Sequence, residues 1–171
     1  MRRALFALLL LAASPVWAAQ APKELTWSEL IPPDAMPEVP NMQPLHNLSG
    51  IAGALESAPA AKQEMPHAPV VQSLDGQHVR LPGYIVPLEV SESGRTIEFL
   101  LVPYFGACIH VPPPPSNQIV HVKSEVGVKL DELYQPYWIE GKMQVKPSSS
   151  ELADAGYQMD AEKIYIYELP E

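Results

Sequence analysis

The fold is decided by the stretch SLDGQHVRLPGYIVPLEV, residues 73–90. Asp75-Gly76 is a turn signal, and the run that follows has alternating apolar positions, which is the pattern of a strand with one buried face. Before Val70 the chain is crowded with proline and poor in β-branched residues. From Val70 onward it consists of strand-like runs separated by turn signals. We therefore expect a β domain that begins near residue 70.

Four more strands are predicted downstream of this run. They cover 96–104, 118–123, 137–146 and part of 156–169, and a short helix is expected at 128–135. Five strands with one short helix between the third and the fourth is the order of an OB-type barrel. We predict a mainly β protein with a small five-stranded OB-like barrel, and an open sandwich of the same strands is the alternative. In either fold Pro82, Pro87 and Pro103 belong at strand ends, edges or bulges.

Composition divides the chain into three parts. Residues 1–18 have an arginine-containing start, a short apolar run and a small-residue exit, which is the layout of a secretory signal peptide. Residues 19–69 form a Pro/Ala-rich N-terminal arm, in which WSEL predicts one helical turn capped by Thr26 or Ser28. Trp27, Leu30 and Ile31 are expected to pin this arm to the third part, the barrel domain of residues 70–171. We expect a periplasmic protein, cleaved near Ala18.

Charge and cysteine content narrow the class of protein. The net charge is −9, with 11 basic and 20 acidic residues and no cluster of Lys and Arg, which argues against nucleic-acid partners and anionic membrane surfaces. No second long apolar run follows the signal peptide, so we do not expect a membrane-embedded protein. The single cysteine excludes an internal disulfide, and a lone thiol in an oxidising compartment is expected to be buried, ligated or reactive.

That cysteine lies in the stretch PYFGACIHVPPPPSNQIVHV, residues 103–122. Cys108 and His110 are two positions apart, so in an extended segment they share a face. The prolines that follow form a stiff connection to His121 on the next predicted strand. Cys, His and His suit zinc first and copper second, and three protein ligands leave a fourth position open. The alternative is that Cys108 is a small buried apolar residue and the histidines have ordinary structural places.

Five other residues are candidates for the fourth position of such a site. They are three histidines and two carboxylates: His46, His67, His78, Glu98 and Glu125.

A thiol-dependent enzyme is a further alternative. Cys108 would be the nucleophile, His110 or His121 the base, and amides near residues 106–107 the oxyanion donors. The four prolines remove four successive N–H groups beside the thiol, which makes this a poor place to stabilise negative charge. No Ser-His-Asp arrangement is apparent elsewhere in the sequence. We therefore expect a protein that is not an enzyme.

The prolines themselves allow two interpretations. They join two strong strand signals, which favours a structural connector. Alternatively they form an exposed ridge, beside aromatic side chains, that docks against a groove of a partner protein. The candidate partner-binding residues are Tyr104, Phe105, Pro112, Pro113, Pro114 and Pro115.

Four blocks of the sequence resemble a family of exported bacterial proteins of unknown function. The blocks are LTWSELIPP, LDGQHVRLPGYIVPLE, YWIEGKM and FLLVPYFGACIHVPPPPSNQIVHV, the last of which holds the signature PYFGACIHVPPPP, and the similarity spans residues 25–169. The resemblance implies a periplasmic accessory protein of a MacB-like ABC transporter, encoded beside it with a second small exported protein and linked to zinc supply. Position by position, the Cys and His of the family's core block fall on Cys108 and His110, and its later strand histidine falls on His121, which strengthens the metal-site prediction. The chain lacks the His-rich tract of a bulk zinc carrier. A purely structural partner-binding module is the remaining alternative.

Overall fold

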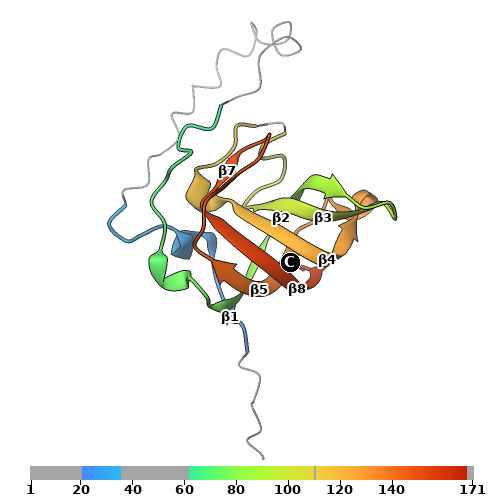
Figure 1. Ribbon diagram of the computed structural model, residues 1–171, viewed down its shortest axis with the longest axis horizontal. Helices are drawn as coiled ribbons and strands as arrows, with labels where there is room; N and C mark the ends of the chain where they lie inside the picture. Colours follow the sequence, from blue (N-terminus) through green and yellow to red (C-terminus); the bar gives the residue numbers. More distant parts are fainter. Residues whose placement is uncertain (1–20, 36–61, 110, 169–171) are drawn as a thin grey trace, which may run out of the picture.

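The structure is a computed structural model that describes residues 21–35, 62–109 and 111–168. The predicted signal peptide, residues 36–61 of the arm and His110 lie outside the described residues. Five long strands dominate the fold (Figure 1): β2 His78–Val90, β3 Arg95–Val102, β4 Val120–Lys129, β5 Tyr137–Gln144 and β8 Tyr157–Ile166. Three strands are short: β1 Lys23–Glu24, β6 Ser148–Ser149 and β7 Asp154–Ala155. No helix among the described residues is long and apolar enough to cross a membrane.

The five long strands form a closed barrel. Their order is β2-β3-β4-β8-β5, and β5 pairs back with β2. Neighbouring strands are antiparallel except β4 and β8, which run parallel and lie side by side in Figure 1. This is the Greek-key order of an OB barrel, so the mainly β, OB-like prediction is confirmed and the open sandwich is not formed.

The barrel closes because β2 changes partners along its length. Residues from His78 to Gly83 pair with β5, whereas those from Tyr84 onward pair with β3. At the junction, a Cβ on Gly83 would lie 2.7 Å from the carbonyl oxygen of Val102, so only glycine allows this approach of the backbones. Pro82 precedes the junction, and Pro87 precedes a register shift in β2. Together with Pro103, which follows the last residue of β3, they occupy the predicted kinds of position.

Two apolar clusters lie on opposite sides of the barrel wall. The interior cluster takes inward-facing side chains from all five long strands, including Phe99, Ile139 and Tyr157. The second cluster lies on the outer face of β2 and β3 and beside the residue that precedes β4. Its buried members are Val86, Leu100, Val102, Ala107, Ile119, Ala153 and Ala155, and we call this set the outer cluster. Later segments of the chain therefore cover part of the barrel's outer face.

The N-terminal arm contributes to the interior cluster. Leu25 and Leu30 are fully buried in it, and the Tyr157 hydroxyl donates a hydrogen bond to the Leu30 carbonyl at 2.8 Å. The predicted turn is the 3₁₀ helix η1, Trp27–Leu30, which begins after Thr26. The Trp27 indole N–H donates to the Pro82 carbonyl at 2.7 Å. The arm therefore closes one end of the barrel.

The residues after the prolines hold the arm in place. They form the 3₁₀ helix η4, Ser116–Gln118. The Ser116 hydroxyl accepts the Ala68 N–H at 2.9 Å, and the Asn117 amide donates to the Pro69 carbonyl at 2.8 Å. The Gln118 amide donates to the Trp27 carbonyl at 2.9 Å. Two separate parts of the arm are thus bonded to one turn of the barrel.

One prediction about the connection from β4 to β5 was wrong in detail. The expected helix at 128–135 is a single 3₁₀ turn, η5, Leu130–Glu132, and β4 continues to Lys129 instead of ending at residue 123. Between two matched pairs, Glu98↔Lys123 and Thr96↔Val128, β4 carries four residues opposite the single Ile97. This large bulge contains Gly127 with a φ of 62°. Its extra residues interrupt the alternation of inward-facing and outward-facing side chains along β4, so the sequence pattern of the strand ends early.

Leu30→Ala tests whether the arm is part of the cooperative fold. Because Leu30 is fully buried, we expect the free energy of unfolding to fall by about 2–5 kcal/mol. Leu130→Ala is the matched control: Leu130 is 46% exposed, and a change within about 0.5 kcal/mol is expected. Urea denaturation followed by tryptophan fluorescence measures both. Equal effects for the two variants would show that the arm contributes little to stability.

Candidate functional site

The connection from β3 to η4 crosses the outer face of the barrel. It begins after Val102 and includes Ala107, which is fully buried in the outer cluster. The N–H groups of Ile109 and Val111 both donate to the Gly106 carbonyl, at 3.3 and 3.2 Å, and close a tight turn. Within this turn Cys108 has a φ of 65°, a left-handed conformation that is costly for a residue with a side chain. The buried alanine and the turn together fix where the cysteine lies.

The Cys108 side chain is half-buried and packs against the outer cluster. Burial raises the pKa of the Cys108 thiol to about 11, because a thiolate is poorly solvated there. At neutral pH the side chain is therefore a protonated thiol, the form that is neither nucleophile nor metal ligand.

His121 lies on β4 opposite Leu100 of β3, with its side chain on the same outer face. Its Nε2 is 2.7 Å from Oε1 of Glu98, and its Nδ1 is 2.9 Å from the Ser148 hydroxyl oxygen. Both ring nitrogens are thus engaged, and the imidazole joins β3, β4 and β6. The residue is only 9% exposed.

Glu98 carries the negative charge of this group. Burial alone would raise the pKa of its carboxyl, but the hydrogen bond from His121 and the ammonium of Lys123 outweigh burial, so the pKa lies below its usual value. The Lys123 Nζ is 3.4 Å from Oε2 of Glu98 and is largely exposed. Glu98 is therefore ionised at neutral pH and holds the imidazole in place.

The structure places Cys108 and His121 on one face but does not complete a metal centre from the residues it describes. Within residues 21–35, 62–109 and 111–168, no three His, Cys, Asp or Glu side chains form a group that could hold a metal ion. His110, the third predicted ligand, and His46 lie outside these ranges. Of the fourth-ligand candidates, Glu98 contacts His121, whereas His78 pairs with Glu162 of β8 at 3.2 Å. The predicted site of Cys108, His110 and His121 remains a prediction.

Ser148 is the residue of this group that sequence reasoning missed. It is 27 positions from His121, in a Pro-Ser-Ser-Ser run that reads only as a turn. The line Ser148–His121–Glu98 has the composition of a serine triad, although the serine bonds Nδ1 and the carboxylate Nε2, the reverse of the serine proteases. Its evident role is to tether the β6–β7 hairpin to the barrel wall. No sequence signal pairs these residues, because only the folded hairpin brings them together.

The same connection presents large apolar side chains to the surface. Four residues are 42–60% exposed: Tyr104, Phe105, Ile109 and Val111. The prolines are less exposed than a ridge would require, since Pro113 and Pro114 are buried and only Pro112 is exposed. The prolines therefore act mainly as a connector, and the aromatic and aliphatic side chains before them form the exposed surface.

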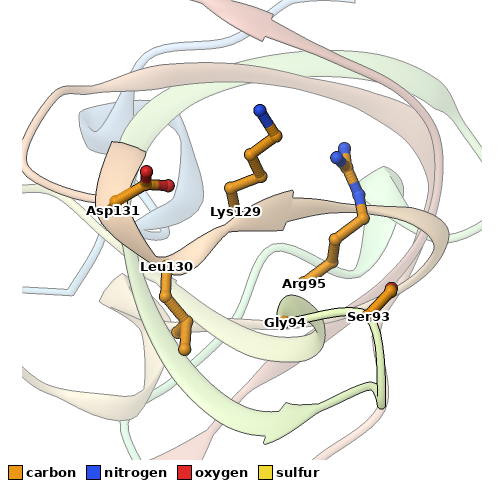
Figure 2. A pocket seen from close by; sticks show the side chains of 6 residues that line it. All are labelled: Ser93, Gly94, Arg95, Lys129, Leu130 and Asp131. Carbon is orange, nitrogen blue, oxygen red and sulfur yellow. The ribbon is translucent and has the colours of Figure 1, made fainter.

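A shallow pocket lies elsewhere, where the β2–β3 turn meets the end of β4. Figure 2 shows the side chains of Arg95 and Lys129 extending to the same side of it, with Leu130 pointing away from them. The Arg95 guanidinium donates to the carbonyls of Val126 and Gly127, both at 2.7 Å, and Lys129 pairs with Glu132 at 3.6 Å. Both cations are thus used within the fold, which makes this pocket a weaker candidate than the Cys108 loop.

These features define an OB-type barrel whose outer face is covered by its own chain. The chain belongs to a family described as "Protein of unknown function (DUF3299)", whose model matches residues 27–166. It is similar to the crystal structure of a DUF3299 family protein from Pseudomonas aeruginosa PAO1, with 60% sequence identity and a TM-score of 0.76. The match covers 88% of this chain and 99% of that one. The chain has no match among curated proteins.

Alkylation of the native protein tests the state of Cys108. With a pKa near 11 instead of 9, the thiolate fraction at neutral pH is about a hundredfold lower, so iodoacetamide should react at least that much more slowly than with the urea-unfolded chain. Mass spectrometry reads the rate directly because the chain has one cysteine. A native rate equal to or above the unfolded rate would restore the thiol-enzyme alternative.

Glu98→Gln tests the charge that holds His121. Since folding lowers the pKa of Glu98 below 4.5, its stabilising effect is complete at pH 7 and is lost as the pH falls through the folded value. We expect the variant to lose roughly 1 kcal/mol at pH 7 and the difference from wild type to shrink below pH 4.5. Urea unfolding at several pH values measures this, with Glu125→Gln as the surface control. A difference that does not change with pH would rule out the charged interaction.

Proposed function

We propose that the protein is a non-enzymatic accessory protein of the periplasm that binds zinc through Cys108, His110 and His121. One observation carries the proposal: Cys108 and His121 approach the same apolar patch on one face of the barrel. Cys108 packs against the outer cluster, and His121 is the cross-strand neighbour of Leu100, a member of that cluster. His110 is two residues from the cysteine along the chain.

The types of donor in this set fit zinc. One thiolate and two imidazoles leave a position open for water or for a ligand from another molecule, and copper(I) is the second choice for the same donors. Binding requires two changes at the described residues. Cys108 must lose its proton, and His121 must release one nitrogen from Glu98 or Ser148. Zinc, when bound, would cross-link the β3–η4 connection to β4.

One feature favours a binding role over catalysis by a thiol. The four prolines remove N–H donors from the chain beside Cys108, so there is little to stabilise an oxyanion. The raised pKa of Cys108 does not separate the two roles, because the thiolate is the form that a nucleophile and a metal ligand both require. A purely structural partner-binding module would share the lack of donors, and zinc binding distinguishes it from the present proposal.

The cellular part of the proposal is an accessory role for a MacB-like ABC transporter or its small exported companion. It is supported by the signal-peptide layout of residues 1–18 and by the resemblance of the sequence blocks to exported proteins encoded beside such transporters. The acidic surface, with a net charge of −9, is compatible with contact to a cationic partner surface.

Zinc titration by calorimetry tests the metal site. We expect wild type to bind one zinc at micromolar or tighter affinity, and Cys108→Ala, His110→Ala and His121→Ala each to weaken it at least tenfold. His78→Ala is the matched control, because His78 is on β2 and pairs with Glu162. Affinity should fall as the pH is lowered, and binding should release protons, because both thiol and imidazole must be deprotonated to ligate. Equal affinity in all four variants would reject the site.

A further inference from the structure

Four large apolar side chains before the prolines are exposed on one loop. Tyr104, Phe105, Ile109 and Val111 lie within eight residues, and each is more than 40% exposed. No Asp, Glu, Lys or Arg occurs between Glu98 and Lys123. A cluster of large apolar side chains kept in water is costly, and in a folded protein it usually marks a contact surface. We call these four residues the apolar tip.

Several contacts hold the loop of the apolar tip against the barrel. Ala107 is buried in the outer cluster, and the N–H groups of Ile109 and Val111 bond the Gly106 carbonyl. The ring of Phe105 packs edge-on against that of Tyr84, with centroids 5.8 Å apart. A surface fixed before contact loses little conformational entropy on binding. The conformation of the tip is therefore set by contacts within the protein before a partner binds.

The charges next to the apolar tip are acidic. The β6–β7 hairpin adjoins the loop: its Ala153 and Ala155 share the outer cluster with Ala107. Within the hairpin, residues 148–155, the chain has Glu151 and Asp154 but no Lys or Arg, and Glu151 is exposed. An anionic lipid surface, or a second copy of this chain, would bring like charges together at this place.

We propose that the apolar tip docks into a concave apolar site on another protein, and that the rim of this site carries Lys or Arg. The partner supplies an apolar groove because the four side chains of the tip are large, apolar and exposed, and it supplies the basic rim because the hairpin beside the tip is acidic. The inference rests on the proposed accessory role, because that role requires a protein partner. Docking of the apolar tip does not require bound zinc. The inference assigns the accessory role to the apolar tip as the surface that contacts the partner protein.

Site-specific photo-crosslinking in the periplasm tests this proposal with the full exported chain. Benzoylphenylalanine is placed at position 105 and, as the control, at position 134, where Tyr134 is 70% exposed on another part of the barrel. We expect position 105 to cross-link one protein that position 134 does not, and Ile109→Ser to remove that product. Mass spectrometry identifies the partner.

A cross-linked product alone does not establish docking by the apolar tip. The partner is therefore purified, and its affinity for this protein is measured. Phe105→Ser and Ile109→Ser should each weaken binding at least tenfold, Tyr134→Ser should leave it unchanged, and added NaCl should weaken it. Thermal unfolding of each variant shows that the exposed substitutions leave the fold intact.

Four results would overturn the proposal. They are the absence of a cross-link specific to position 105, a cross-link to a second copy of the chain, binding unaffected by salt, and sedimentation with phosphatidylcholine/phosphatidylglycerol vesicles that requires Phe105 and Ile109. Each result is independent of the zinc titration. A failed docking surface would therefore leave the metal site standing, and a failed metal site would leave the docking surface standing.

Discussion

The change of partner along β2 is the constraint on which the rest of the structure depends. A strand that pairs with β5 in its first half and with β3 in its second half must bend sharply, and the bend is possible because Gly83 lets the backbone approach Val102. The bend closes the barrel around the interior cluster. It also turns the second half of β2 so that its outward side chain Val86 joins Leu100 and Val102 of β3 in one apolar surface. The bend in β2 at Gly83 is therefore the common cause of barrel closure and of the outer cluster.

The outer cluster explains why the candidate site lies on a loop and not on the barrel wall. OB barrels commonly bind their ligands on the face of the second and third strands, which here are β3 and β4. In this chain that face carries Leu100 and Val102 and is covered by small side chains of two later segments, among them Ala107 and Ala153. The part of this face around Leu100 and Val102 is therefore used for packing. The candidate residues Phe105, Cys108 and Ile109 are carried by one of the covering segments.

The parts of this fold that follow local rules could be predicted from the sequence. Alternation predicts the first long strand, runs of apolar, β-branched and aromatic residues predict the other four, and the prolines lie at the strand ends and irregularities where proline is expected. The β4 bulge was missed because four residues opposite one break the alternation. The Ser148–His121–Glu98 line was missed for a different reason: its members come from three segments, and their meeting depends on how a short hairpin folds back over the barrel. Contacts between residues that are far apart along the chain produce no repeating pattern of residue types, so a single sequence does not reveal them.

The β3–η4 connection has two sides, and they favour different kinds of molecule. Its inner side carries Ala107 and the neutral thiol of Cys108 against the outer cluster, and its outer side carries Phe105 and Ile109 in water. The two sides are joined by the turn closed on the Gly106 carbonyl. A metal that drew Cys108 away from the outer cluster would strain this turn and shift the apolar side chains on its other side. Conversely, a partner that fixed those side chains would hold Cys108 in its left-handed conformation, where it is buried and protonated. By linkage, a partner and a metal that prefer different geometries of the turn would each weaken the other's binding by the same factor.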